Sequence, residues 1–192
     1  MKETFIIAIF IIFIYIFMNI NNSKFVLIES KDGQKVRVND KIDKKASADL
    51  LSEIIKRIYR LRNYLESNIS KYPEYKECIE LLTKNLNPER TQIYENSTSS
   101  EYTSYSVNKG EEIVFCLRSK KTGELHDINL MMYVTIHELA HVGCFEIGHT
   151  PLFKRIFAFY LTVAIELGLY KYDNYDSNPV EYCGMILSST II

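Results

Sequence analysis

The sequence has no excess of charge of either sign, no tryptophan and no closely spaced cysteine pair. Lys and Arg number 23 and Asp and Glu 24, which gives a formal net charge of −1. This balance provides no basic surface of the kind that binds nucleic acid. The four cysteines, Cys78, Cys116, Cys144 and Cys183, form no C-x-x-C motif. We therefore expect neither a zinc knuckle nor a dense disulfide framework. Four buried thiols are the favoured interpretation, and one disulfide is the alternative in an oxidising compartment.

The N-terminus contains an unbroken apolar run from Phe5 to Met18, which Ile20 closes after one asparagine. A helix from Phe5 to Ile20 spans about 24 Å, which is short for a bilayer core of ~30 Å, although the flanking residues could extend it. No small residues follow where a signal peptide would be cleaved. We predict an uncleaved single-pass membrane anchor over residues 1–22. Lys2 alone precedes the run, whereas seven Lys and Arg side chains follow it by residue 45, which favours the cytoplasmic side for the rest of the chain.

The 192 residues, 47% of them hydrophobic, allow one domain over residues 23–192 behind this anchor. Two strand-like segments that flank the turn residues Asp32-Gly33 predict a hairpin of strands 25–28 and 35–38. An apolar stripe predicts an amphipathic helix over residues 46–68, and a second helix is expected over 73–86. Residues 23–88 form either a separate subdomain or one wall of a cleft. Strands are expected over 102–107 and 113–117.

The most informative stretch is His137-Glu138-Leu139-Ala140-His141, because the chain has only four histidines. Apolar residues from Ile128 onward predict a buried helix that ends at Gly143. On a helix, residues four apart lie on one face, so both imidazoles are able to bind the same Zn²⁺. Glu138 is then placed to act as a general base on water without binding the metal.

A catalytic zinc site usually has three protein ligands and one open position. His149 is the preferred third ligand, because Gly148 allows a sharp return of the backbone and Thr150-Pro151 is a good helix start. Glu146, on the same loop, and Glu166, on the following helix, are the alternatives. His126 precedes the metal helix and is expected to be exposed.

The motif His137–His141, together with Gly148-His149-Thr150-Pro151-Leu152-Phe153, resembles the WLM and SprT-like zinc metalloproteases. The resemblance implies an α+β zincin-like fold, in which a small β-layer packs on helices around the central HExxH helix. It also implies that His137, His141 and His149 bind zinc and that Glu138 is the general base. The spacing between the second and third histidines fits neither subfamily closely. The apolar N-terminus and the composition resemble small membrane-anchored members predicted from large DNA viruses.

The sequence therefore predicts a membrane-anchored zinc metallopeptidase that hydrolyses peptide bonds in protein or peptide substrates. Tyr182 is the favoured further donor to the oxyanion, ahead of Tyr172 and Tyr175. Strand 113–117 is expected at the edge of the sheet, where it would hold an extended substrate. The alternative is a non-catalytic, membrane-tethered zinc module closed by a fourth ligand, for which Cys144 and Cys183 are candidates.

Overall fold

The computed structural model describes residues 25–192. The predicted membrane anchor over residues 1–22 lies outside this range. None of the helices within residues 25–192 has the length and hydropathy that a bilayer crossing requires.

The first part of the described chain follows its local sequence pattern closely. Strands β1 (Phe25–Glu29) and β2 (Lys35–Asn39) form the expected antiparallel hairpin, with Gly33 at a φ of 83° in the turn. Helix α2 (Lys44–Ser67) then turns its apolar stripe inward. The second predicted helix begins later than expected, because two 3₁₀ turns, Ile69–Lys71 and Pro73–Tyr75, precede α3 (Lys76–Asn85).

The sheet is mixed and has five strands in the order β1-β2-β3-β5-β4. Strand β3 (Gln92–Glu95) was not predicted; it pairs in parallel with both β2 and β5 (Glu112–Phe115). Strand β4 (Tyr105–Val107) pairs antiparallel with β5 only. The prediction that strand 113–117 forms the edge was wrong, since β5 lies between β3 and β4.

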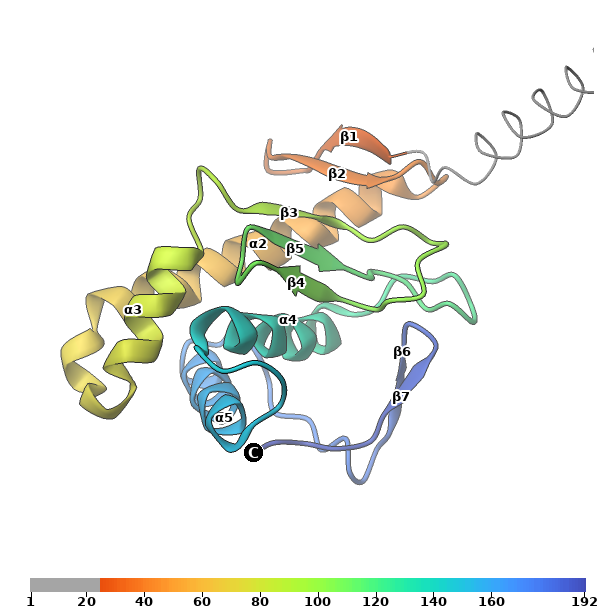
Figure 1. Ribbon diagram of the computed structural model, residues 1–192. Coiled ribbons are helices and arrows are strands. Elements are labelled where there is room, and N and C mark those ends of the chain that lie inside the picture. Colours follow the sequence, from red (N-terminus) through yellow and green to blue (C-terminus); the bar gives the residue numbers. More distant parts are fainter. Residues whose placement is uncertain (1–24) are drawn as a thin grey trace, which may run out of the picture.

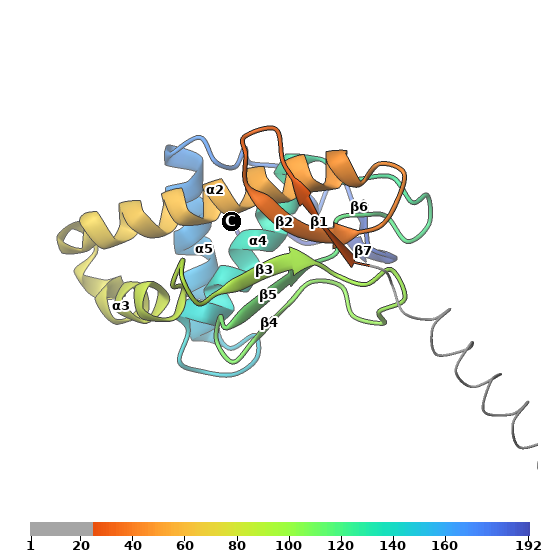
Figure 2. The ribbon, with the colours of Figure 1, turned by 90° about the horizontal axis from the view of Figure 1, so that it is seen from above.

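The helices cover the sheet in layers (Figure 1). Helix α2 runs behind the sheet, and α4 (Ile128–Gly143) lies between the sheet and α5 (Pro151–Glu166). A separate hairpin of β6 (Val180–Tyr182) and β7 (Met185–Leu187) stands beside the end of the sheet. The view from above shows α2 crossing over α4 and α5 (Figure 2). The predicted α+β class with a central HExxH helix is confirmed.

One hydrophobic core joins all these elements. It includes the fully buried Leu51 and Ile58 of α2, Phe115 of β5, Ile136 of α4 and Ile156 of α5. The N-terminal hairpin and α2 therefore share their core with the helix that carries the histidines. Packing on both sides of α4 fixes the axis of that helix and so the direction of its side chains.

Helix α4 approaches its neighbours closely at Gly143. A Cβ atom there would meet the hydroxyl of the buried Tyr160 on α5 and would lie 3.1 Å from the carbonyl oxygen of Cys78 on α3. The Tyr160 hydroxyl itself donates to that carbonyl, at 3.2 Å. The C-terminal end of α4 is thus held against both α3 and α5.

We expect Gly143→Ala to lower the free energy of unfolding by about 1–3 kcal/mol, because the added methyl group overpacks this crossing. Denaturant unfolding of the single variant, of Tyr160→Phe and of the double variant measures the effect. Since Tyr160→Phe removes the atom nearest to the added methyl, the double variant should lose less stability than the sum of the two single variants. Additive losses would show that the Tyr160 hydroxyl does not limit the approach.

Candidate metal centre

Helix α4 presents the two histidines of the motif on one face. The side chain of Asp127 caps its first turn and accepts hydrogen bonds from the backbone N–H groups of Asn129 and Leu130, at 2.8 and 3.1 Å. Leu139 and Ala140 are fully buried on the opposite side. His137 and His141 lie on one face of the helix, one helical turn apart, as the sequence predicted.

The third histidine comes from the loop between α4 and α5. His149 follows Gly148, which has a φ of 83°, and precedes Thr150, whose hydroxyl caps α5 by accepting from the N–H of Phe153 at 3.2 Å. Its Nε2 atom lies 3.1 Å from Nε2 of His137 and 3.2 Å from Nε2 of His141. Within residues 25–192, these three side chains are the group whose ligand atoms converge closely enough to hold a metal ion.

This spacing fits a zinc ion. Zinc–nitrogen bonds of ~2.0–2.1 Å at tetrahedral angles separate two ligand nitrogens by about 3.3 Å. The two separations measured here are 3.1 and 3.2 Å. Three neutral imidazoles are also a donor set that zinc accepts. The residues present therefore suit a divalent metal of the zinc type.

The three imidazoles share one aromatic neighbour, Phe153, in the first turn of α5. The centroid of its ring lies 5.0 Å from that of His137, 4.2 Å from that of His141 and 4.8 Å from that of His149. Phe153 is 2% exposed, so its position is set by the core. Its ring restricts all three imidazoles to orientations in which their Nε2 atoms face each other.

Burial sets the charge states of the site. It lowers the pKa of His137 to about 3 and that of His141 to about 4, with further contributions from the neighbouring histidines. Both imidazoles are therefore neutral at pH 7, the form that binds metal. Burial also raises the pKa of Glu138 to about 7, and a hydrogen bond with Ser106 lowers it in part. A carboxyl group tuned to this range suits a general base.

A cavity of about 700 Å³ opens over the histidines and Glu138. One wall is the segment Thr103–Ser106, which includes the start of β4. The opposite side includes Ile147, and the β6–β7 hairpin adds Tyr182 and Met185. The unpaired edge of β4 thus borders the site, which is the position that the sequence had assigned to strand 113–117.

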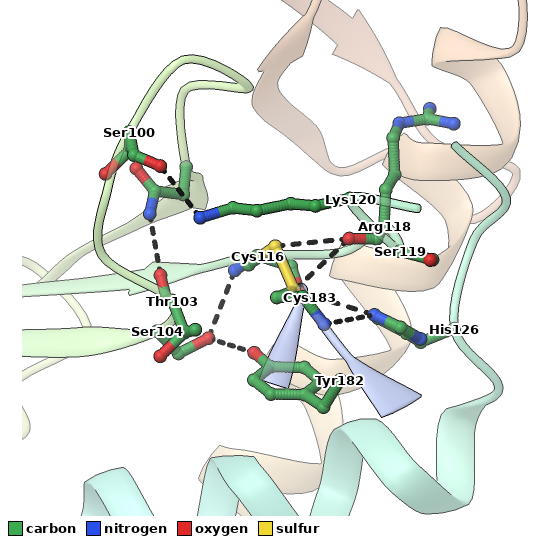
Figure 3. The surroundings of a disulfide bond; sticks show 12 residues. Ser100, Thr103, Ser104, Cys116, Arg118, Ser119, Lys120, His126, Tyr182 and Cys183 are labelled. Carbon is green, nitrogen blue, oxygen red and sulfur yellow. Dashed lines mark hydrogen bonds between the residues drawn. A yellow bond between two sulfur atoms is a disulfide. The ribbon is translucent and has the colours of Figure 1, made fainter. Parts of the chain in front are cut away.

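A disulfide between Cys116 and Cys183 ties the β6–β7 hairpin to the end of β5 (Figure 3). The prediction of four free thiols was wrong for this pair, although all four cysteines are buried and Cys78 and Cys144 remain free. Ser104 connects the end of β5 to the β6–β7 hairpin. Its hydroxyl accepts a hydrogen bond from the N–H of Cys116 at 3.0 Å and is hydrogen bonded to the hydroxyl of Tyr182 (Figure 3). The disulfide therefore helps to place Tyr182 in the cavity wall.

Other residues singled out in the sequence lie elsewhere. Glu166 is exposed at the end of α5, and neither Glu166 nor Glu146 belongs to the histidine cluster. His126 is half-buried, not exposed as expected, and its Nε2 accepts from the N–H of Cys183 at 3.3 Å. Of the three tyrosines considered, Tyr182 lines the cavity, whereas Tyr172 and Tyr175 do not.

Ser104, Ser106 and Lys109 are among the residues lining the cavity that were not recognised from the sequence as parts of the site. The pattern of residues 102–110 indicated a strand and a turn, which is what the structure contains. No local signal shows which helix that strand will face. Cys144, considered as a fourth ligand, is fully buried and lies outside the cluster.

Fold and site together define an α+β protein with a three-histidine centre, able to bind metal, on its central helix. The chain belongs to the same family as uncharacterized protein R325 of Acanthamoeba polyphaga mimivirus, with 47% identity over 150 residues that cover 78% of this chain and 75% of that protein. Uncharacterized protein 136R of Invertebrate iridescent virus 6 is 45% identical over 69 residues, which cover 35% of this chain and 38% of that protein. The predicted similarity to proteins of large DNA viruses is confirmed.

No family model matches the chain. Among solved structures, the chain is similar to the crystal structure of Wss1 from Saccharomyces cerevisiae, with a TM-score of 0.45 and 16% identity. That alignment covers 68% of this chain and 88% of Wss1. A Wss1 mutant aligns with a TM-score of 0.36 and 18% identity.

Loss of the disulfide should destabilise the protein by about 4 kcal/mol, because the bond closes a loop of 67 residues in the unfolded chain. Denaturant unfolding with and without a dithiol reductant measures this loss. The variant Cys116→Ala/Cys183→Ala is the matched control and should not respond to the reductant. Equal stability of the oxidised and reduced wild type would contradict the prediction.

Proposed function

We propose that this protein is a zinc-dependent metallopeptidase that hydrolyses peptide bonds in a protein or peptide substrate. The observation that carries the proposal is the convergence of three imidazole Nε2 atoms beside a buried carboxyl group at the base of an open cavity. A site of three histidines leaves one position for water or substrate, which is typical of catalytic zinc.

His137, His141 and His149 would hold the metal through their Nε2 atoms. Zinc in such a site supplies a Lewis acid that lowers the pKa of water to ~7 and polarises a carbonyl group. The protein keeps two of the three ligands neutral by burial, so protons do not compete with the metal at pH 7.

Glu138 is the proposed general base. Its carboxylate takes a proton from the water that attacks the peptide carbonyl carbon, and it then delivers that proton to the leaving amine nitrogen. The products are one carboxylic acid and one amine, and the carboxylate is regenerated. Burial raises the pKa of the Glu138 carboxyl group, which makes its carboxylate a stronger base for this proton transfer.

Tyr182 is the proposed donor to the carbonyl oxygen as negative charge develops on it. Burial raises the pKa of the Tyr182 phenol, and the charge of Glu138 contributes in the same direction. The phenol therefore stays protonated at neutral pH. Its hydrogen bond with Ser104 orients the hydroxyl within the cavity wall.

The free edge of β4 gives the substrate a place to bind. An extended peptide added to this edge would continue the sheet and pass over the histidines, with backbone hydrogen bonds supplying the affinity. Such binding selects for extended, unfolded segments and depends little on their sequence.

The competing function, a closed zinc module without catalysis, needs a fourth protein ligand. Cys183 is bound to Cys116, and Cys144 is buried outside the cluster, so neither candidate is available to the site as described. The membrane anchor and the cytoplasmic placement stay predictions, since they depend on residues outside the described range.

Glu138→Gln should retain one zinc per chain and lower the cleavage rate of an unfolded protein substrate by about 10²–10⁴-fold, the usual contribution of a general base. The measurements are metal analysis and the cleavage of a fluorescently labelled denatured protein. Glu146→Gln is the matched control and should retain both zinc and activity. If Glu138→Gln cleaves at the wild-type rate, Glu138 is not the general base.

His149→Ala should lower zinc affinity by more than ~100-fold, because it removes a direct ligand and the loss of supporting partners alone costs ~10–100-fold. Competition with a chromophoric chelator measures the affinity. His126→Ala, a histidine outside the cluster, should bind zinc as the wild type does. Unchanged affinity of His149→Ala would exclude His149 as the third ligand.

A further inference from the structure

The loop that carries His149 has no regular secondary structure of its own. Residues 144–150 connect α4 to α5, and Phe145 and Ile147 within this loop are 61% and 90% exposed. Such a loop is expected to be mobile unless polar contacts hold it. Two ligands of the proposed site are fixed by a buried helix, so the geometry of the site depends on what holds the third.

The ammonium group of Lys109 binds this loop. It donates to the carbonyl oxygens of Cys144 at 2.7 Å and Glu146 at 2.8 Å, and it lies 3.5 Å from the carbonyl oxygen of His141. A lysine ammonium has three donors, and all three have an acceptor here. The contacts join the end of α4, which carries one metal ligand, to the loop that carries another.

The end of a helix favours such a cation. The last carbonyl groups of a helix lack partners within it and carry a partial negative charge. At the end of α4, the Lys109 ammonium group contacts the carbonyl oxygen of His141. The side-chain amide of Asn85 donates to the carbonyl oxygen of Val142 at 3.2 Å. Lys109 thus satisfies polar groups that the fold otherwise leaves open.

The turn that delivers Lys109 has an uncommon backbone conformation. Asn108 and Lys109 have φ values of 46° and 58°, and Gly110 has a φ of 112°. Asparagine and glycine tolerate positive φ, whereas a lysine there costs roughly 1–2 kcal/mol. Gly110 rests on α4, since a Cβ atom at that position would lie 3.0 Å from Val142 Cγ1. The turn therefore packs against the end of α4 and directs the Lys109 side chain toward the loop that carries His149.

We propose that Lys109 is a positioning residue that holds the His149 loop against the end of α4 and so preforms the three-histidine site. The proposal deepens the proposed function and depends on it. Lys109 touches no ligand nitrogen; it acts through the backbone of the loop. Because it follows β4 directly, the same turn connects the edge that would bind substrate to the loop that completes the metal site.

Lys109→Met removes the charge and the donors but keeps the length of the side chain. In the full-length protein, we expect it to lower zinc affinity by about 10–100-fold, the range seen when a group that orients a metal ligand is removed. Lys109→Arg keeps the charge and several donors and should recover most of that loss. Chelator competition measures the affinity, and chemical unfolding of the metal-free protein measures stability separately.

Lys120→Met is the matched control. The Lys120 ammonium also donates to two loop carbonyl groups, those of Ser100 at 2.8 Å and Tyr102 at 3.3 Å, but this loop lies on the disulfide side of the molecule (Figure 3). Lys120→Met should therefore change zinc affinity by less than ~2-fold, even if it lowers stability.

A double-variant cycle tests whether Lys109 acts through His149. In the His149→Ala background, Lys109→Met should cause no further loss of zinc affinity, because the ligand that it positions is absent. If Lys109→Met does not fold, Lys109→Gln, which keeps donors but not the charge, takes its place in the same cycle.

The inference would be overturned if Lys109→Met bound zinc as tightly as the wild type does. It would also be overturned if Lys109→Met lowered zinc affinity equally in the wild-type and His149→Ala backgrounds. Either result leaves the proposed function standing, provided that the wild type binds zinc through its three histidines. A wild-type chain whose zinc binding is unaffected by His149→Ala contradicts the proposed function itself, so the two failures are distinguishable.

Discussion

The structure depends on bringing three imidazole groups together, with Nε2 of His149 lying 3.1 Å from Nε2 of His137 and 3.2 Å from Nε2 of His141. Protonation of these rings would set like charges in contact, and burial already disfavours the charged form of His137 and His141. The arrangement is stable only with neutral rings or with a cation between them. Helix α4, the first turn of α5 and the ring of Phe153 hold the nitrogens in this geometry.

The wall opposite the helix is held by a different kind of bond. Cys116 and Cys183 lie 67 residues apart, and their disulfide fixes a short two-stranded hairpin that has no other sheet to join. Isolated hairpins of this size are marginally stable in water. Disulfides persist in oxidising compartments, whereas the lysines and arginines after the apolar run favour the cytoplasmic side. The covalent structure of the domain and the charge pattern of the chain thus point to different compartments.

Local patterns in the sequence predicted the parts of this structure that local interactions determine. The first hairpin, α2, α4 with its end at Gly143, and the start of α5 at Pro151 follow from alternation, helical periodicity and capping residues. The position of His149 beside the other two histidines was also predictable, because Gly148 and Thr150 define how the loop turns. Strand β3 was missed because its four residues carry no alternation strong enough to separate them from the polar loop that follows.

Local sequence patterns did not predict which strands, or which cysteines, pair with each other when they lie far apart in the chain. Which strand forms the edge depends on strand order, and β3 takes its place between β2 and β5 through contacts across the sheet. The pairing of Cys116 with Cys183 depends likewise on where the β6–β7 hairpin packs. Free thiols were predicted because widely spaced cysteines do not indicate which two the fold will bring together.

The groups that would perform the chemistry come from four separate segments of the chain. Only the helix supplies several of these groups from neighbouring positions in the sequence. The helix supplies His137, Glu138 and His141; the loop supplies His149; β4 supplies Ser106; and the second hairpin supplies Tyr182. Ser106 of β4 is hydrogen bonded to Glu138, and Ser104, which directly precedes β4, is hydrogen bonded to Tyr182, so this segment contacts both the proposed general base and the proposed donor to the oxyanion. A substrate strand bound to that edge would therefore meet a general base and a phenol whose positions are set by the strand it pairs with. The proposed substrate binding and the proposed chemistry would thus be coupled through Ser104 and Ser106.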